Sequence, residues 1–297
     1  MTSREGPRVV AIGGGHGLAV TLRAAREYAA AITAIVSVAD DGGSTGRLRR
    51  DYQVPAPGDL RKCLVALAGD DAGVWCEAFE HRFESGDLGG HALGNLIIVG
   101  LAESTGDFGR ALEEAGRLLR AVGRVLPATT EPVVLKATIA GREVEGQTAV
   151  QSAIGRIAKV GLVPEDAPTS PEAAAAIAGA DQVLLAPGSL YTSLLPVLCV
   201  HGVRRALAGS RGTVVQVGNL TPQIPETAGM DGTDHVQAVL DHGARVDRLL
   251  APSDGVLAVD ADRLAAAGIT VTRVPLARPD RTAHDPAKLA KALEALL

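Results

Sequence analysis

The chain has 297 residues, of which 46% are apolar, and a formal net charge of −5 from 29 basic and 34 acidic residues. This length and apolar fraction suffice for a large buried core. The acidic and basic residues are interspersed and form no basic stripe, so nucleic acid is not an expected partner. Aromatic residues make up only 2% of the chain, which leaves no base-stacking surface.

No membrane span, secretory signal or cysteine-based site is expected. The most apolar run, residues 183–200, is interrupted by Pro187 and Pro196. The N-terminal sequence MTSREGPR lacks the apolar core of a secretory signal. Cys63, Cys76 and Cys199 are too scattered for a disulfide framework or a zinc site. We therefore expect a cytoplasmic protein with reduced thiols and no metal site.

Short β-branched runs alternate with longer helix-like stretches along the first part of the chain. Residues 8–12 and 32–38 predict buried parallel strands, and each is followed by a glycine-rich or acidic turn. Helical spacing follows at residues 18–30, 59–69, 94–104 and 108–122. This alternation is typical of a mostly parallel sheet that is covered by helices.

The middle of the chain has a different pattern, after which the alternation resumes. Residues 131–150 show β-branched alternation around the sequence AGRE, which predicts an inserted β-hairpin. Later strands are predicted at 181–186, 213–217, 245–251 and 270–276, and helices at 172–180, 190–207, 232–243 and 285–297. We predict a single α/β domain over residues 1–297, with a doubly wound, mostly parallel sheet and helices on both faces.

The sequence GGGHG, which follows the first predicted strand, indicates an anion site. Gly13, Gly14, Gly15 and Gly17 allow a sharp turn and a close approach of the backbone to a ligand. The helix predicted to begin near Leu18 would direct its unpaired N–H groups at the same place. The motif is neither the standard dinucleotide fingerprint nor the phosphate loop of ATPases. A tight strand-to-helix turn without a ligand is the alternative.

A second loop, ADDGGSTG, follows the second predicted strand. Asp40 and Asp41 can bond ribose or sugar hydroxyls, and Gly42, Gly43 and Ser44 come next. Ligands of open α/β sheets lie beyond the carboxyl ends of the strands, where the two loops would be neighbours. Removing either charge is expected to spare the fold, and removing at least one of them is expected to weaken binding. The alternative is that the two carboxylates cap the next helix.

Three further stretches place polar groups at predicted strand or helix ends. Asp59 in PGDLRKCL is a predicted N-cap, with Arg61 and Lys62 behind it. Asn95, in GHALGNL beside His91, lies on an otherwise apolar helix, where its amide would be costly unless something bonded it. The stretch APGSLYTS supplies further ligand candidates, which are Gly188, Ser189, Tyr191 and Thr192.

Six ordered blocks carry a resemblance to a known family. They are GGGHG, VADDGGSTGRLR, PGDLRKCLVAL, GHALGNL, PGSLYTS and TDHV, and they span about residues 9–236. In this order the chain resembles the YvcK-type proteins, the bacterial gluconeogenesis factors of the CofD-like superfamily. The other branch of that superfamily consists of 2-phospho-L-lactate transferases on a similar Rossmann-like fold.

The resemblance implies a Rossmann-like nucleotide-sugar binder with UDP-glucose or UDP-N-acetylglucosamine as ligand. It also implies a link to cell shape, peptidoglycan synthesis and growth on gluconeogenic carbon. His16 replaces the more common threonine of the family loop, and either clasps a phosphate or faces solvent. The sequence of the loop around Asn219 differs from the usual family sequence near Pro222 and Gly229, although Asn219 itself remains a ligand candidate.

The preferred function is that of a non-catalytic regulator that senses a UDP-sugar and alters contacts with enzymes of wall synthesis. The alternative is a transferase of phosphorus-containing groups, in which the carboxylates of ADDGG hold Mg²⁺ against a donor diphosphate. A plain oligomeric scaffold is the third reading. No residue is an unmistakable nucleophile, since Ser189 has no evident histidine partner. No cofactor other than this Mg²⁺ is expected, and a homo-oligomer is expected.

Overall fold

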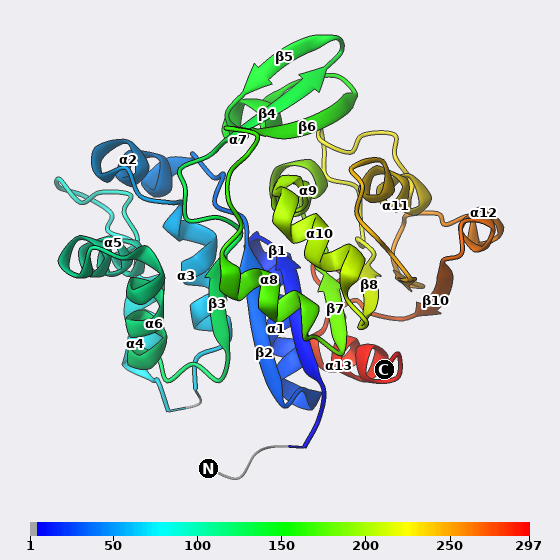
Figure 1. Ribbon diagram of the computed structural model, residues 1–297, viewed down its shortest axis with the longest axis horizontal. Helices are drawn as coiled ribbons and strands as arrows, with labels where there is room; N and C mark the ends of the chain where they lie inside the picture. The colour runs from blue at the N-terminus through cyan, green and yellow to red at the C-terminus, as the bar shows by residue number, and fades with distance from the viewer. Residues whose placement is uncertain (1–4, 70) are drawn as a thin grey trace.

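A seven-stranded sheet runs through the middle of the molecule, and every neighbouring pair of its strands is parallel (Figure 1). The computed structural model describes residues 5–69 and 71–297. Residues 1–4, which belong to the N-terminal segment expected to carry no secretory signal, lie outside this range. The strand order is β10-β9-β8-β7-β1-β2-β3. The strands are β1 (Arg8–Gly13), β2 (Ala31–Val36), β3 (Arg124–Pro127), β7 (Gln182–Leu185), β8 (Thr213–Val217), β9 (Arg248–Pro252) and β10 (Thr270–Val274).

Helices cover both faces of this sheet, which confirms the predicted doubly wound α/β class. On one face α1 (Gly15–Tyr28) packs against α3 (Pro57–Ala66) and α13 (Pro286–Glu294). On the other lie α8 (Pro171–Ala178), α9 (Leu195–Cys199) and α10 (His201–Gly209) (Figure 1). The core between the layers includes the fully buried side chains of Ile12, Leu18, Leu22, Ile35 and Leu60.

Two groups of helices lie at the sides of the sheet. The chain between β2 and β3 forms α2 (Gly43–Tyr52), α4 (Val74–Glu80), α5 (Leu93–Thr105) and α6 (Phe108–Leu118). Near β9 and β10 lie α11 (Gly232–Asp241) and α12 (Ala261–Ala266) (Figure 1). Within the described residues no helix is both long and apolar enough to cross a membrane.

A small antiparallel sheet lies beyond the carboxyl ends of the main strands (Figure 1). The hairpin predicted at 131–150 is present as β4 (Val134–Ile139) and β5 (Arg142–Glu145). Ala140 and Gly141 form its turn with positive φ values of 48° and 77°, as a two-residue hairpin turn of the primed type requires. β6 (Ile157–Val163) pairs with the other side of β4, and α7 (Gln147–Ser152) packs against β4. The sequence pattern predicted neither β6 nor α7.

The largest correction among the elements concerns the single helix predicted at 190–207. The structure divides it into a π-helical turn η1 (Leu190–Leu194), α9 and α10. Val200 interrupts the helix with an extended backbone at φ −68° and ψ 114°. Short strand β3 and helices α4 and α12 were also not predicted. They are brief and lack the length over which a hydrophobic period becomes visible.

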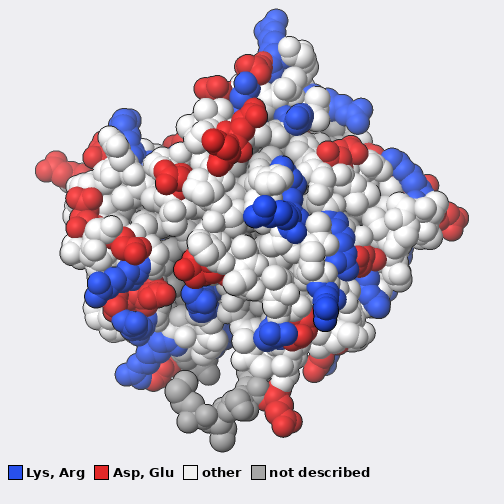
Figure 2. Space-filling model, in the orientation of Figure 1, with Lys and Arg blue, Asp and Glu red and all other residues white. Residues whose placement is uncertain are grey.

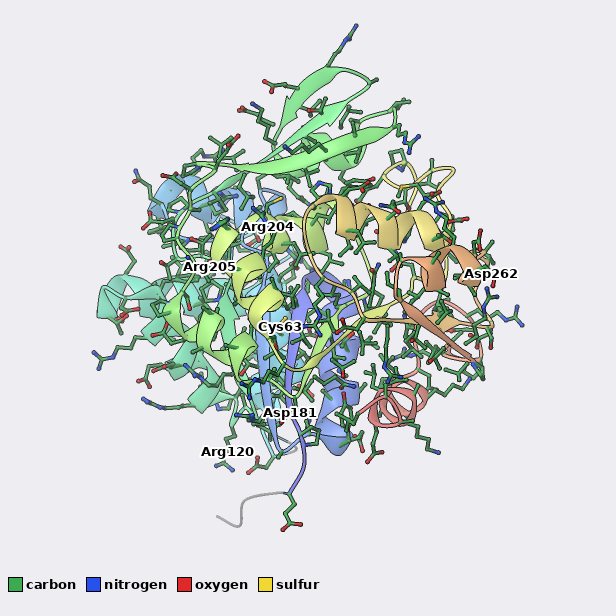
Figure 3. The ribbon with its side chains drawn as sticks, turned by 45° about the vertical axis from the view of Figure 1, so that its right-hand side comes forward. Cys63, Arg120, Asp181, Arg204, Arg205 and Asp262 are labelled. Carbon is green, nitrogen blue, oxygen red and sulfur yellow. The ribbon has the colours of Figure 1, made fainter. Side chains whose placement is uncertain are left out.

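The orientation of the sheet places its carboxyl edge toward the small sheet. Asp181, which is labelled near the foot of the molecule in Figure 3, forms an ion pair of 3.2 Å with Arg8 at the amino ends of β7 and β1. Cys63 is buried inside the molecule on α3, and burial raises the pKa of its thiol well above the ordinary value. Acidic and basic side chains are interspersed over the face that Figure 2 presents.

Candidate functional site

A crevice is expected where the connections of the sheet change direction, between β1 and β7. β1 pairs with β2 on one side and with β7 on the other. The chain leaves β1 through β2 and β3, and then returns to β7 and continues outward through β8. Open α/β sheets bind ligands at such a switch point, beyond the carboxyl ends of the strands. The loops after β1, β2 and β7 are the candidate ligand loops that the sequence singled out.

The glycine-rich segment after β1 is the first turn of α1 rather than a bare loop. The helix begins at Gly15, three residues before the predicted start at Leu18. Gly13 and Gly15 have positive φ values of 150° and 62°. A side chain at Gly15 would meet nothing within 4 Å, so the backbone conformation, and not packing, favours glycine there.

Gly17 has a different role from Gly15. An added Cβ at Gly17 would lie 1.8 Å from the carbonyl oxygen of Pro187 in the loop after β7. The absence of a side chain therefore allows α1 to touch that loop. Gly14 is similarly crowded, since its Cβ would lie 2.6 Å from Oδ2 of Asp59. Gly17 therefore fits the alternative of a tight structural turn without a ligand. Gly15 does not, because it borders open space.

The start of α2 repeats the arrangement at α1. Gly42 is the N-cap and Gly43 has a φ of 48°, with open space where a side chain would be. Neither α1 nor α2 has a side-chain cap or an acidic residue in its first turn. By contrast, a side chain caps the N-terminus of five other described helices, through Asp107, Ser170, Asp231, Asp260 and Asp285. The N-termini of α5 and α10 also lack a side-chain cap, but those of α1 and α2 follow the neighbouring strands β1 and β2, where an anion can complete both.

Asp40, in the loop between β2 and α2, has a largely buried carboxyl group. Its Oδ1 accepts a hydrogen bond of 3.0 Å from the backbone N–H of Gly42. Burial is the main cause that raises the pKa of Asp40 above its usual range. The hydrogen bond from Gly42 opposes this shift, and the negative charge of Asp59 adds to it. Arg49 donates to the backbone carbonyl of Asp40 at 2.9 Å and to that of Val133, which fixes the loop to the chain before β4.

Asp59 and Lys62 form part of the same crevice. Asp59 is the third residue of α3, which begins at Pro57 after an Ala56 N-cap, so the prediction that Asp59 is an N-cap was wrong. Its side chain instead lies against Gly14 and accepts a hydrogen bond of 3.0 Å from Nζ of Lys62. The contact of Asp59 with Gly14 could not be predicted from the sequence, because the two residues belong to different turns of the chain.

Asp41 is committed to a structural contact with the small sheet. Its carboxylate accepts hydrogen bonds from the backbone N–H of Gln147 at 2.9 Å and of Thr148 at 2.9 Å, and from Oγ1 of Thr148 at 2.7 Å. It therefore caps α7, more than 100 residues away, and not the next helix. The expectation that removal of the Asp41 charge spares the fold does not agree with these bonds.

Asn95 belongs to a buried hydrogen-bond network. It is 2% exposed, and its Oδ1 accepts from Nε of Arg61 at 3.1 Å while its Nδ2 donates to Oγ of Ser44 at 3.1 Å. Ser44 Oγ lies 3.1 Å from Nδ1 of His91. Since the amide of Asn95 can only donate to Ser44, the serine hydroxyl is free to donate to a neutral His91. Burial and the charge of Arg47 lower the pKa of His91, which favours that neutral form. The network fixes the first turn of α2.

The loop after β7 is held by Asn219 and Glu226. Asn219 Oδ1 accepts from the backbone N–H of Gly188, and its Nδ2 donates to the carbonyl of Gly188, both at 2.9 Å. Glu226 accepts from the backbone N–H of Tyr191 at 2.7 Å and from Oγ1 of Thr192 at 2.9 Å. The side chain of Glu226 is 5% exposed, and burial raises its pKa. Asn219 and Glu226 thus hold the backbone between Gly188 and Thr192 in place.

A cavity of about 180 Å³ lies beside the glycine-rich turn of α1. His16 and Gly17 border it on one side, and Gly188 and Asn219 on the other. It also includes residues that the sequence reasoning missed, which are Val20, Pro187, Leu220, Thr221, Gln223, Thr282, Ala283 and His284. Tyr191 is not part of it and lines a separate cavity.

Of the predicted ligand residues, the structure brings His16, Gly17, Gly188 and Asn219 together at one cavity and places Tyr191 at another. Ser189 is the N-cap of η1 but makes no side-chain cap. Glu226 was missed as a site residue because its partners, Tyr191 and Thr192, are distant in sequence. Among residues 5–69 and 71–297 no group of three or more His, Cys, Asp and Glu side chains is placed to hold a metal ion.

Comparison with known proteins gives the family of the chain. The model of the family described as 2-phospho-L-lactate transferase CofD matches residues 9–291. This chain belongs to the CofD family. Its relatives place it with the gluconeogenesis factors of that family. The gluconeogenesis factor of Halalkalibacterium halodurans is 43% identical over 236 residues, which are 79% of this chain and 73% of that protein.

Two further relatives and one solved structure support this placement in the CofD family. The gluconeogenesis factor of Bacillus subtilis is 38% identical over 312 residues, covering 98% of each chain. The putative gluconeogenesis factor of a Nostoc species is 46% identical over 237 residues, but the match spans only 52% of that longer protein. A crystal structure of a UPF0052 family member from Bacillus halodurans superimposes with a TM-score of 0.92 at 36% identity, over 98% of this chain and 99% of that one.

Proposed function

We propose that this chain binds a nucleoside-diphosphate sugar, of the UDP-glucose or UDP-N-acetylglucosamine type, in the crevice between β1 and β7, and acts as a regulator. The naming of its relatives as gluconeogenesis factors supports a role in growth on gluconeogenic carbon. The resemblance stated from the sequence extends that role to cell shape and peptidoglycan synthesis, with enzymes of wall synthesis as partners.

The observation that carries the proposal is the pair of helix N-termini at one edge of the sheet. α1 and α2 both begin at glycine, without a side-chain cap, after neighbouring parallel strands. Unpaired N–H groups and two helix dipoles stabilise negative charge at this edge. A diphosphate has the size and charge to accept from both helix starts.

The cavity beside α1 is suited to the nucleoside end of such a ligand. Its wall includes the apolar side chains of Val20, Leu220 and Ala283, against which a planar base can pack. Oε1 of Gln223 is buried there without a hydrogen-bond partner. A base that offers an N–H group would satisfy this acceptor. In this proposal Asp40, on the β2 side, accepts hydrogen bonds from the sugar hydroxyls.

Calorimetric titration tests the proposal with UDP-N-acetylglucosamine, UDP-glucose, GDP and inorganic pyrophosphate. We expect the UDP-sugars to bind and to raise the melting temperature by a few degrees, since a ligand at about 100 times its dissociation constant adds about 2.7 kcal/mol. No heat and no shift with millimolar UDP-sugars would refute nucleotide-sugar binding. Binding of GDP alone would replace uridine with another base.

A pair of variants locates the site. Gly15→Val forces a β-branched residue into a positive φ and projects a side chain into open space, so we expect it to abolish binding. Leu22→Ala on the buried side of α1 is the matched control, with a cost of about 2–5 kcal/mol in stability and no change in affinity. Equal losses of affinity in both variants would favour the structural-turn reading of the glycine segment.

A transferase is the second candidate, because the negative charge of Asp59 acts on the largely buried carboxyl group of Asp40. Mg²⁺ is commonly held by one or two carboxylates together with substrate phosphates, and this pair fits that donor set. The bound ion would neutralise charge on a donor diphosphate. If EDTA leaves UDP-sugar affinity unchanged and no free nucleotide is released with candidate acceptors, the regulator is supported. Loss of affinity on chelation, or release of nucleotide, supports the transferase.

A further inference from the structure

A second cavity lies at the junction between the small sheet and the main body, apart from the crevice described above. It has a volume of about 310 Å³ and is bordered by the start of β6, the turn η1 and the outer face of α11. A neighbouring hollow of about 470 Å³ shares Arg156, Ile157, Met230 and Asp234 with it. Pockets of this size accommodate small organic ligands.

The buried hydroxyl group of Tyr191 lines this cavity with only a weak partner. Tyr191 is 5% exposed, and its Oη contacts Sδ of Met230 at 3.7 Å, which is a poor hydrogen-bond acceptor. Burial raises the pKa of Tyr191, so the phenol stays protonated at neutral pH. A buried O–H donor without a good acceptor is costly, and an acceptor group on a ligand would satisfy it.

The charged side chains around Tyr191 are of both signs. Arg156 borders the cavity and has no ion pair in the described part of the chain. On α11, Asp241 accepts a hydrogen bond of 2.8 Å from Gln237 and has no cationic partner among the described residues. Asp234 is different, because Nη1 of Arg263 lies 4.0 Å from its carboxylate. Arg156 and Asp241, which are both exposed, therefore have no ion-pair partner among the described residues.

We propose that this junction cavity binds a small zwitterion of the amino-acid type. The ligand carboxylate accepts hydrogen bonds from the guanidinium group of Arg156 and the hydroxyl group of Tyr191. The ligand ammonium group donates to the carboxylate of Asp241. An apolar ligand side chain packs against Ile157 and Met230, the apolar part of the wall.

The charge balance favours a zwitterion over a simple anion. A carboxylate alone would leave Asp241 without a cation and bring a negative charge near it and Asp234. An amine alone would leave Arg156 and the Tyr191 hydroxyl without an acceptor. A molecule that carries both groups gives a partner to Arg156, to Tyr191 and to Asp241.

This site is independent of the proposed nucleotide crevice. The segment from Asn219 to Met230 passes between the two cavities, with Gln223 on the side of the crevice and Glu226 on the side of the junction. The bonds of Glu226 to Tyr191 and Thr192 hold the segment in place. Failure of nucleotide binding would therefore leave the junction proposal standing, and the reverse also holds.

Titration with three matched probes tests the proposed ligand class. L-phenylalanine carries both charged groups, 3-phenylpropionate lacks the ammonium group, and phenethylamine lacks the carboxylate. We expect L-phenylalanine to bind with a dissociation constant on the order of 1 mM, as befits its size, and the other two at least tenfold more weakly. No binding of L-phenylalanine at 10 mM (about ten times that constant), or equal binding of 3-phenylpropionate, would overturn the proposal.

Variants test the assigned contacts. Arg156→Gln and Tyr191→Phe should each weaken L-phenylalanine binding about tenfold, the scale of a lost charged hydrogen bond. Asp241→Asn should reduce the preference for L-phenylalanine over 3-phenylpropionate. Arg142→Gln, on the exposed strand β5, is the matched control and should bind normally. Affinity that is unchanged in both Arg156→Gln and Tyr191→Phe, with normal melting curves, would remove the site from this cavity.

Discussion

Asp40 and Asp41 are neighbours in sequence, and we predict opposite consequences when each is changed to Asn. Asp41 accepts bonds from two backbone N–H groups and one hydroxyl group at the start of α7, at 2.7–2.9 Å. The Asn side chain keeps one acceptor oxygen and replaces the other with an amide group, which repels the N–H donors. Asp40 instead has a raised pKa, so its charge is unfavourable in the folded protein.

The magnitude for Asp41→Asn follows from those bonds. The loss of one charged acceptor from a partly buried helix cap costs about 1–3 kcal/mol. For a chain of this size each kcal/mol lowers the melting temperature by about 2 °C, so Asp41→Asn should melt about 2–6 °C below the parent. Helix α7 should lose protection from amide hydrogen exchange first, because its own cap is the group removed.

The effect of Asp40→Asn has the opposite sign and depends on pH. The pKa of Asp40 is raised in the folded state, mainly by burial, so the folded protein binds its proton more tightly than the unfolded chain does. The stability that the protonated group contributes is fully present below the unfolded pKa of about 3.9, and is lost as pH rises through the folded pKa. At pH 7 Asp40→Asn should therefore melt no lower than the parent, and this advantage should disappear near pH 4.

Differential scanning calorimetry at pH 4 and pH 7, together with UDP-N-acetylglucosamine titration at pH 7, separates the two roles. Asp40→Asn should lose roughly tenfold in affinity while the fold is spared, a change of about 1.4 kcal/mol. The reasoning is refuted if Asp40→Asn melts several degrees below the parent and still binds normally, since the group would then be a structural cap. It is equally refuted if Asp41→Asn melts like the parent.

Three other substitutions test separate contacts. Gly17→Ala should destabilise the fold by about 1–3 kcal/mol or more in urea unfolding, because the new Cβ would lie 1.8 Å from a carbonyl oxygen in the loop after β7. Stability equal to that of the parent would show that this contact relaxes without cost. Glu226→Ala should cost about 1–3 kcal/mol in the same measurement, since the backbone N–H of Tyr191 and the hydroxyl group of Thr192 lose their buried acceptor, whereas an unchanged midpoint would contradict that role. Burial lowers the pKa of His242, so the stability that the neutral imidazole contributes is present above the unfolded pKa of about 6.5 and is lost as pH falls. In His242→Gln the unfolding midpoint should therefore depend less on pH between pH 7 and 5. The same pH dependence in the variant and the parent would contradict this role of His242.

The sequence predicts the parts of this fold whose causes are local. A glycine such as Gly15 or Gly43 is required by a positive φ at its own position, and this requirement is visible in the sequence of a few residues. Buried parallel strands such as β1 and β7 are nearly continuous apolar runs, because both faces of each strand are covered. The class of the sheet, the hairpin and both glycine turns could therefore be predicted, although the helices after those turns begin earlier than expected.

The roles of polar side chains depended on contacts that the sequence does not show. Asp59 has the position of a helix-start residue, yet its environment is determined by Gly14, which lies 45 residues earlier. Tyr191 and Thr192 look like ligand groups in their own loop, but Glu226 from another segment takes up the backbone N–H of one and the hydroxyl group of the other. A propensity or a motif gives the type of group available, and only the fold decides its partner.

Asp40 and Asp41 are one pair of identical side chains to which the fold gives different partners. The carboxylate of Asp41 is bonded to α7, which packs against β4 of the small sheet, and the next residue in the N-terminal direction borders the candidate ligand crevice. Arg49 adds a second link, since it donates both to the carbonyl of Asp40 and to that of Val133 just before β4. Two sets of hydrogen bonds therefore join the acidic loop to the small sheet and to the chain just before it. Of the two adjacent carboxylates, Asp41 holds this contact, while the carboxyl group of Asp40 stays a ligand candidate on the β2 side.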